Sequence, residues 1–294
     1  MKKLISKSLA ATALTLAMST SAWAGPVILG GEDLTDHGSR SAGGSNLQGW
    51  LYIEKAISNL YSAQTRPGAF TVDIVALGSA DPGAGVYTSS DAGGAINSVA
   101  NVLGRGVSFY DGAASISSFF AALAAGTVNP GIIWLAGTGA VNDLVFDEGA
   151  ALTTNAIAID QFVGSGGGLM AHGSGVNAYG WLSALLPGLS NVSGCDSSGA
   201  TLTAAGTAAF PGLSNSDIDA TAGPCHSNFQ GNFGGLTTLA IDGGGQSYII
   251  GSAGGGGGSI TRPPTGQVPE PASLALMGLG LAGLGFARRR KQAA

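Results

Sequence analysis

Two stretches of sequence decide the fold: GIIWLAG at residues 131–137 and GLMAHG at residues 168–173. Each is a short, almost continuous apolar run that ends in glycine, which is typical of a strand buried on both faces. Residues 155–163 lie between them and place apolar side chains at helical spacing. This order predicts parallel strands of one sheet with a helix packed against it.

The same alternation of strand and helix extends over most of the chain. Beyond Pro187 the sequence becomes rich in glycine, serine and threonine, and two further apolar runs follow it. The pattern predicts an open three-layer α/β fold with a mostly parallel sheet. The predicted strands are residues 26–31, 70–77, 107–110, 131–135, 168–171, 236–241 and 247–250, and the predicted helices are 49–61, 91–103, 115–124, 155–163 and 178–186.

The N-terminus has the order of features expected of a secretion signal. Three lysines precede the apolar run at residues 9–17, and Ser21-Ala22-Trp23-Ala24 supplies small residues at the positions that signal peptidase reads. We predict a signal peptide at residues 1–24. The alternative is an N-terminal membrane anchor, but the apolar run is shorter than the roughly 20 residues that a spanning helix needs.

The C-terminus combines a proline motif, an apolar segment and a basic end. The motif VPEPAS occupies residues 268–273, and the glycine-containing apolar segment that follows predicts a transmembrane helix at about residues 272–287. Basic residues tend to stay cytoplasmic, so the basic end at residues 288–291 places the preceding chain outside the inner membrane.

This tail resembles the PEP-CTERM sorting signal of Gram-negative bacteria, and the residues that carry the resemblance are Pro269, Glu270, Pro271, Arg288, Arg289 and Arg290. The resemblance implies that an exosortase-type transpeptidase recognises residues 268–294. It also implies passage through the inner membrane, a final place at the cell surface or in the extracellular matrix, and association with exopolysaccharide or biofilm. A single-pass anchor that is never processed is the alternative.

The composition of the part between the two ends predicts a folded domain. The chain of 294 residues is 45% hydrophobic and 10% charged, which allows a large apolar core. We predict an exported α/β domain at residues 25–252 and a Gly/Pro-rich linker at 253–267. Five basic and 16 acidic residues lie between residues 25 and 267, a net charge of about −11 that argues against nucleic-acid partners and is compatible with cations or neutral polysaccharide.

The chain has two cysteines, Cys195 and Cys225. In an exported protein such a pair predicts a disulfide. With Asp196 and His226 they could instead supply zinc ligands, although the C-x-x-C spacing of structural zinc sites is absent. Two unpaired thiols are the third possibility.

Residues 131–137 together with FVGSGGGLMAHG at residues 162–173 resemble the class I glutamine amidotransferase-like superfamily. The resemblance implies a flavodoxin-like sheet in which one strand leads into a sharp turn that carries the nucleophile. Catalytic members have a cysteine at that turn, whereas this chain has His172 or a neighbour there. The resemblance therefore implies a domain that has lost its nucleophile and is not an enzyme.

Ser174 is a candidate nucleophile for a competing hypothesis, an extracytoplasmic serine hydrolase. It lies among glycines directly after a predicted strand, but the G-x-S-x-G pattern is not met because position 172 is histidine. Such an enzyme needs a histidine base, for which His37, His172 and His226 are available. Alternatively, Ser174 caps the next helix at a tight turn.

The predicted ligand site is the carboxyl edge of the sheet, where His37 and His172 follow predicted strands. Glu32, Asp33 and Asp36 lie in the same loop as His37 and could bind calcium, or they could form a solvated acidic loop. No phosphate-binding loop or dinucleotide motif occurs, so no cofactor is predicted. A carbohydrate-binding module is a further alternative, although Trp50, Trp134 and Trp181 all fall in predicted core elements.

Overall fold

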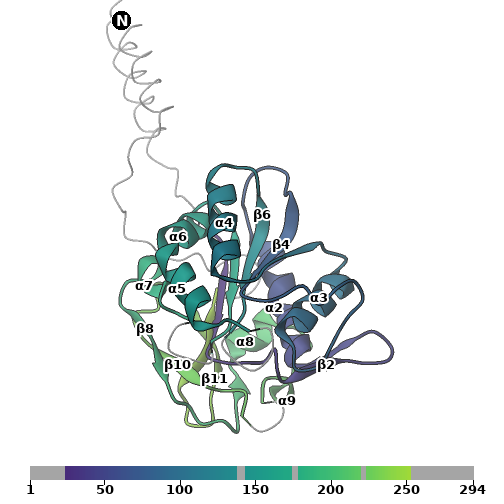
Figure 1. Cartoon of the computed structure of the whole chain (residues 1–294). Coiled ribbons are helices and arrows are strands. Elements are labelled where there is room, and N and C mark those ends of the chain that lie inside the picture. Colours follow the sequence, from purple (N-terminus) through teal and green to yellow (C-terminus); the bar gives the residue numbers. More distant parts are fainter. Residues whose placement is uncertain (1–23, 138–142, 174–177, 220–222, 253–294) are drawn as a thin grey trace, which may run out of the picture. The chain divides into compact units, whose positions relative to one another are not determined.

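The computed structural model of the chain describes residues 24–137, 143–173, 178–219 and 223–252 (Figure 1). The chain divides into two units, residues 1–260 and 261–294, and the described residues all belong to the first. No helix within these residues is long and apolar enough to cross a bilayer. The predicted linker and membrane helix, and all of the predicted signal peptide except its last residue, lie outside the described residues.

A parallel sheet forms the centre of the fold. Its strand order confirms the prediction of a mostly parallel central sheet, and the register places Ile133 beside Val75 on one side and Leu169 on the other. These strands are apolar because helices cover both of their faces. In spatial order they are β5 (Val107–Tyr110), β4 (Val72–Leu77), β6 (Pro130–Leu135), β7 (Gly168–Ala171) and β1 (Val27–Gly30).

Counted from β4 along the chain, the first four parallel strands take the spatial order 2-1-3-4, as in a flavodoxin-like sheet. The next position is different, because β1 from the N-terminus fills it. Beyond β1 the sheet continues with antiparallel strands, of which β11 and β12 were predicted. These are β12 (Ser247–Gly251), β10 (Ser227–Gly231) and β8 (Leu189–Ser193); β11 (Thr237–Ile241) also pairs with β12, and β9 (Thr201–Leu202) pairs with β11.

Helices cover both faces of the sheet, which confirms the three layers (Figure 1). One face packs against α2 (Gly49–Ala63), α3 (Ala92–Leu103), α8 (Ala204–Ala209) and α9 (Asn215–Ile218). The other packs against α4 (Ala113–Ala124), α5 (Phe146–Thr154), α6 (Ala156–Gly164) and α7 (Leu182–Leu185). A small hairpin of β2 (Gly38–Arg40) and β3 (Asn46–Gln48) precedes α2.

The predicted helix at residues 178–186 is mostly wrong, since only Leu182–Leu185 is helical. Residues 178–181 form turns instead. The Tyr179 hydroxyl donates hydrogen bonds to the carbonyl oxygens of Gly30 (2.7 Å) and Ala171 (3.0 Å), at the ends of β1 and β7. These contacts hold the turn against the carboxyl edge of the sheet, and Pro187 ends the short helix.

Candidate functional site

The segments that follow β1 and β7 meet at the carboxyl edge of the parallel sheet. Leu29 pairs with Ala171, so the chain after each strand emerges at the same place. The Gly173 amide donates to the Glu32 carbonyl (3.1 Å), and the His226 amide donates to the Gly31 carbonyl (2.9 Å). Three distant parts of the chain are thereby brought together, and all three histidines of the sequence lie here.

A buried hydrogen-bond chain forms the inner part of this site. Glu32 and His172 are both 0% exposed, and His172 Nδ1 lies 2.7 Å from Glu32 Oε1. On the other side of the ring, Trp134 Nε1 donates to His172 Nε2 over 2.8 Å. An indole N–H can only donate, so Nε2 has no proton and Nδ1–H donates to Glu32. His172 is therefore a neutral imidazole with both ring nitrogens in use.

The Glu32 carboxylate is held by further groups of the interior. Its Oε2 accepts a hydrogen bond from the Leu34 amide at 2.7 Å. Burial, reinforced by the charge of Glu32, raises the pKa of Tyr52 and of Tyr179 well above the ordinary value. Both tyrosines therefore stay protonated beside the carboxylate at any physiological pH. The inner site is a closed polar cluster rather than an open cavity.

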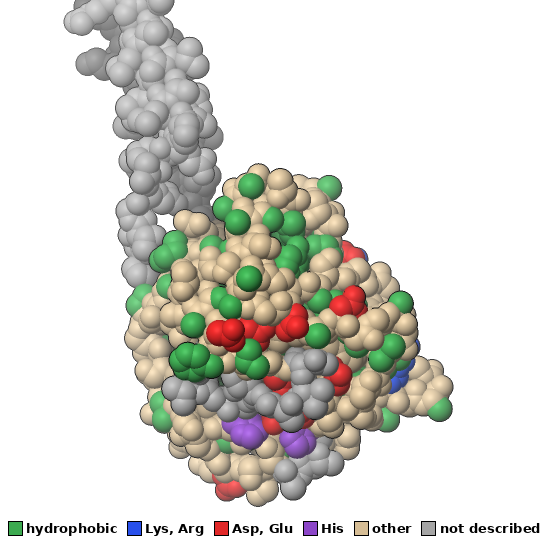
Figure 2. All heavy atoms as spheres, in the orientation of Figure 1, with side chains coloured by type: hydrophobic (Ala, Val, Ile, Leu, Met, Phe, Trp, Pro, Cys, Tyr) green, Lys and Arg blue, Asp and Glu red, His purple; other side chains and the backbone are tan. Residues whose placement is uncertain are grey.

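Asp33, His37 and His226 form the outer part of the site. Asp33 Oδ1 lies 3.2 Å from His37 Nε2, and Asp33 Oδ2 lies 2.7 Å from His226 Nε2. The side chain of Asp33 is only 11% exposed, whereas that of His226 is 39% exposed. Figure 2 shows histidine side chains reaching the surface of the face drawn, next to acidic side chains. The outer cluster is therefore the part of the site that solvent reaches.

The hydrogen bonds of the outer cluster shift the pKa of all three members. The bond to Asp33 is the main cause that raises the pKa of His37 and of His226 above the ordinary value, although burial opposes it. Burial alone would raise the pKa of Asp33, but hydrogen bonds and charges of the two histidines outweigh it, and the pKa of Asp33 is lowered. The cluster therefore favours an aspartate flanked by protonated imidazoles.

The other candidate residues are placed as follows. Asp36 lies in the same turn, where its amide donates to the Asp33 carbonyl (2.8 Å). Glu32 points inward to His172, so any calcium site in this loop would depend on Asp33 and Asp36. Ser174 lies outside the described residues. His172, which occupies the predicted place of the nucleophile, is inaccessible to solvent.

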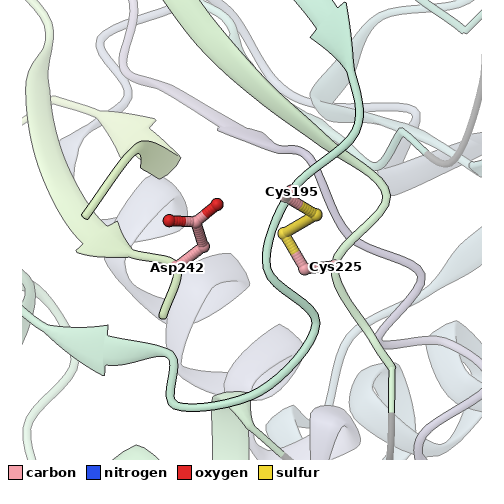
Figure 3. Close-up of side chains that lie close together, drawn as sticks. All are labelled: Cys195, Cys225 and Asp242. Atoms are coloured by element: carbon pink, nitrogen blue, oxygen red, sulfur yellow. A yellow bond between two sulfur atoms is a disulfide. The ribbon is translucent and has the colours of Figure 1, made fainter. Parts of the chain in front are cut away.

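Cys195 and Cys225 form a disulfide (Figure 3). The bond confirms the first of the three predictions for the cysteines and leaves no thiolate for zinc. Asp242 lies beside the two sulfur atoms, and its carboxylate accepts hydrogen bonds from the amides of Asp196 (3.1 Å) and Gln246 (2.7 Å). Cys225 pairs with Glu32 in an isolated bridge, so the disulfide supports the segment that carries His226.

Trp134 is the member of the buried hydrogen-bond chain that the sequence reasoning missed, since it was predicted only as a core residue. The pairing of β6 with β7 could have indicated the contact, because Trp134 pairs with Met170 on the neighbouring strand. Residues two apart on a strand face the same side, so His172 continues the face that Trp134 shares. A prediction that paired these two strands could have found the Trp134–His172 contact.

Comparison with known proteins adds one finding on the tail. The PEP-CTERM protein-sorting motif matches residues 267–291. No curated protein matches the chain, and no solved structure matches it. The resemblance of the domain to the amidotransferase-like superfamily is thus not supported by a homologue or a structure. The matched motif marks the chain as an exported protein that an exosortase processes and that is sorted through the membrane to the cell surface.

Proposed function

We propose that this protein is a non-catalytic component of the cell surface that associates with exopolysaccharide or biofilm matrix. In this proposal the exported domain keeps an amidotransferase-like architecture without its nucleophile. The sorting motif at residues 267–291 supports the surface destination. The parallel strands and their carboxyl-edge site support the architecture.

The state of His172 is the observation that carries the non-catalytic part of the proposal. Its ring is 0% exposed, its Nε2 accepts a hydrogen bond from the Trp134 indole N–H, and its Nδ1–H donates to Glu32. A nucleophile needs an exposed atom with a free lone pair at the turn. Neither cysteine can replace it, because the two are joined to each other.

Cell fractionation tests the matrix association. In an exosortase-containing host that makes exopolysaccharide, we expect the protein to sediment with the matrix. In a matched strain that cannot synthesise the polysaccharide, we expect the same protein in the culture medium. Equal distribution in the two strains would show that the matrix does not hold the protein.

A serine hydrolase remains the second candidate, because the Asp33–His226 contact of 2.7 Å is the kind of carboxylate–imidazole pair that a general base requires. A fluorophosphonate probe separates the two proposals. The non-catalytic proposal predicts no labelling of the folded protein. Labelling that is lost in Ser174→Ala but kept in Ser118→Ala would establish the hydrolase instead.

A further inference from the structure

A groove lies between α7 and β8, next to the turn that follows β7. Its volume is about 350 Å³, within the range of about 300–1,000 Å³ that is usual for small-molecule sites. Ser227 connects the groove to the carboxyl edge, because its hydroxyl donates to the Gly173 carbonyl at 3.1 Å. The groove is nevertheless separate from the outer cluster of Asp33, His37 and His226, none of which lines it.

The described residues that line the groove bear no charged group. Its polar side chains are serine hydroxyls and one amide: Ser183, Ser190, Asn191, Ser193 and Ser227. Asn191 Nδ2 donates to Ser227 Oγ over 2.9 Å, and this hydrogen bond holds the Asn191 side-chain amide in place within the groove. The hydroxyls of Ser183 and Ser193 make no hydrogen bond to other described residues, so they are available to a ligand.

The backbone of β8 adds further hydrogen-bonding groups. Pairing with β10 uses alternate residues of the strand, as shown by the bonds of Gly188 O with Asn232 N (2.9 Å) and of Gly194 N with His226 O (2.8 Å). The intervening residues Asn191 and Ser193 therefore direct their amides and carbonyls outward. Since β8 ends the sheet of described strands, these groups have no strand partner there.

The remaining wall of the groove is apolar. Tyr179, Leu182 and Leu189 line it, and the Tyr179 hydroxyl is already bonded inside the protein. A ligand that fits must therefore combine an apolar face with several uncharged hydroxyl groups. A sugar ring has this chemistry, with C–H groups on its face and hydroxyls on its rim.

We infer that this groove binds a neutral saccharide unit of a polysaccharide. This inference deepens, and rests on, the proposed association with exopolysaccharide. Neutral sugars are favoured over acidic ones because the described residues that line the groove offer no cation and the exported part has a net charge of about −11. A peptide is disfavoured because it brings few hydroxyls to a lining made of short hydroxyl side chains.

A glycan array tests the inference on the purified full-length chain. The array holds neutral hexose and N-acetylhexosamine oligosaccharides beside uronic-acid and sulfated ones. The unaltered protein should bind neutral members, which are then used in titrations. Ser183→Ala combined with Ser193→Ala removes two hydroxyls and should weaken binding by roughly thirty-fold, because each lost hydrogen bond removes about 1 kcal/mol.

Two further variants locate the binding. Ser193→Arg should fill the groove and abolish binding, whereas Ser118→Arg, on the exposed side of α4, should leave it unchanged. Binding only of acidic glycans, or no glycan binding, overturns the inference. So does neutral-glycan binding that Ser193→Arg does not reduce.

These outcomes separate the inference from the proposed function. If the protein sediments with the matrix in cells but Ser193→Arg sediments equally well, the groove assignment fails and the matrix association holds. If purified protein binds neutral glycans through the groove but does not sediment with the matrix, the groove assignment holds and the proposed association fails.

Discussion

At the scale of single residues, His172 stabilises a carboxylate that is buried inside the protein. The variant His172→Leu removes the donor to Glu32 and leaves that carboxylate with one hydrogen bond fewer in the interior. Such a loss costs about 3 kcal/mol of unfolding free energy when the orphaned group is charged. Urea denaturation should therefore show a much larger loss for His172→Leu than for the exposed control His226→Leu. Equal losses of unfolding free energy in the two variants would show that the hydrogen bond from His172 to Glu32 does not stabilise the fold.

The same contacts predict the tautomer of His172. Nitrogen NMR should show a protonated Nδ1 and an unprotonated Nε2, because Trp134 donates to Nε2. In Trp134→Phe the donor is lost, and the Nε2 resonance should shift while the fold is kept. A protonated Nε2 in the unaltered protein would contradict the hydrogen-bond chain.

The outer cluster predicts how stability depends on pH. Folding raises the pKa of His37 and His226 above 6.5, so their contribution is complete below pH 6.5 and is lost as pH rises through the raised values. Folding lowers the pKa of Asp33 below 3.8, so its contribution is present above pH 3.8 and is lost as pH falls through the lowered value. The contacts of Asp33 with His37 and His226 are therefore most stabilising between pH 3.8 and pH 6.5.

The variant Asp33→Asn tests this dependence. The loss of unfolding free energy in Asp33→Asn should be largest between pH 3.8 and 6.5 and should shrink at alkaline pH. In the same variant, proton NMR should show lower titration midpoints for both imidazoles. As a control, Asp147→Asn on the exposed start of α5 should leave the titration midpoints of both imidazoles unchanged. A loss that is the same at every pH would refute the ionic account.

Neighbouring acidic residues show how far the sequence predicts a site. Glu32 and Asp33 were predicted together as ligands of one loop, and their location after the first strand is where the prediction placed them. Their environments differ completely, since Glu32 binds a buried neutral histidine and Asp33 binds two histidines near the surface. The difference depends on contacts with His172 after β7 and with His226 before β10. The sequence of the loop alone does not indicate these long-range contacts.

At the scale of elements, the disulfide joins the segment after β8 to the segment before β10. A crosslink that closes a loop of 30 residues is expected to stabilise the fold by about 3–4 kcal/mol in the chain-entropy model. The double variant Cys195→Ser with Cys225→Ser should lose this stability in urea denaturation. The titration midpoint of His226 should also fall toward its ordinary value, because Cys225 lies next to His226. Rapid alkylation of both cysteines in the unreduced folded protein would contradict the bond.

The predicted elements differ in accuracy for a physical reason. The strands β1, β6 and β7 were predicted because burial on both faces makes them continuously apolar, whereas β4 and the half-buried edge strand β5 are apolar apart from Asp73 and Ser108. By contrast, β8 reads LSNVS and β10 reads SNFQG, with polar residues throughout. Their pairing depends on partners far away in the chain, so the sequence pattern beyond Pro187 predicts no strand there. For the same reason, the groove beside β8 could not be predicted.

At the scale of the whole molecule, sorting depends on the tail rather than on the domain. Deletion of Pro269, Glu270 and Pro271 removes the motif that an exosortase reads. We expect the deleted protein to remain in the inner membrane, whereas Glu32→Gln, which alters only the domain, should still reach the surface. Fractionation followed by immunoblotting distinguishes the two. Surface display of the deleted protein would show that another signal directs sorting.

The intact mass of the protein recovered from the surface of an exosortase-containing host is the most direct test of the central claim. The account predicts a chain that has lost residues 1–24 and the tail beyond the Pro-Glu-Pro motif, and that is two hydrogens lighter because Cys195 and Cys225 are joined. A mass that still includes residues 288–291 would contradict exosortase processing and would identify the tail as a permanent anchor.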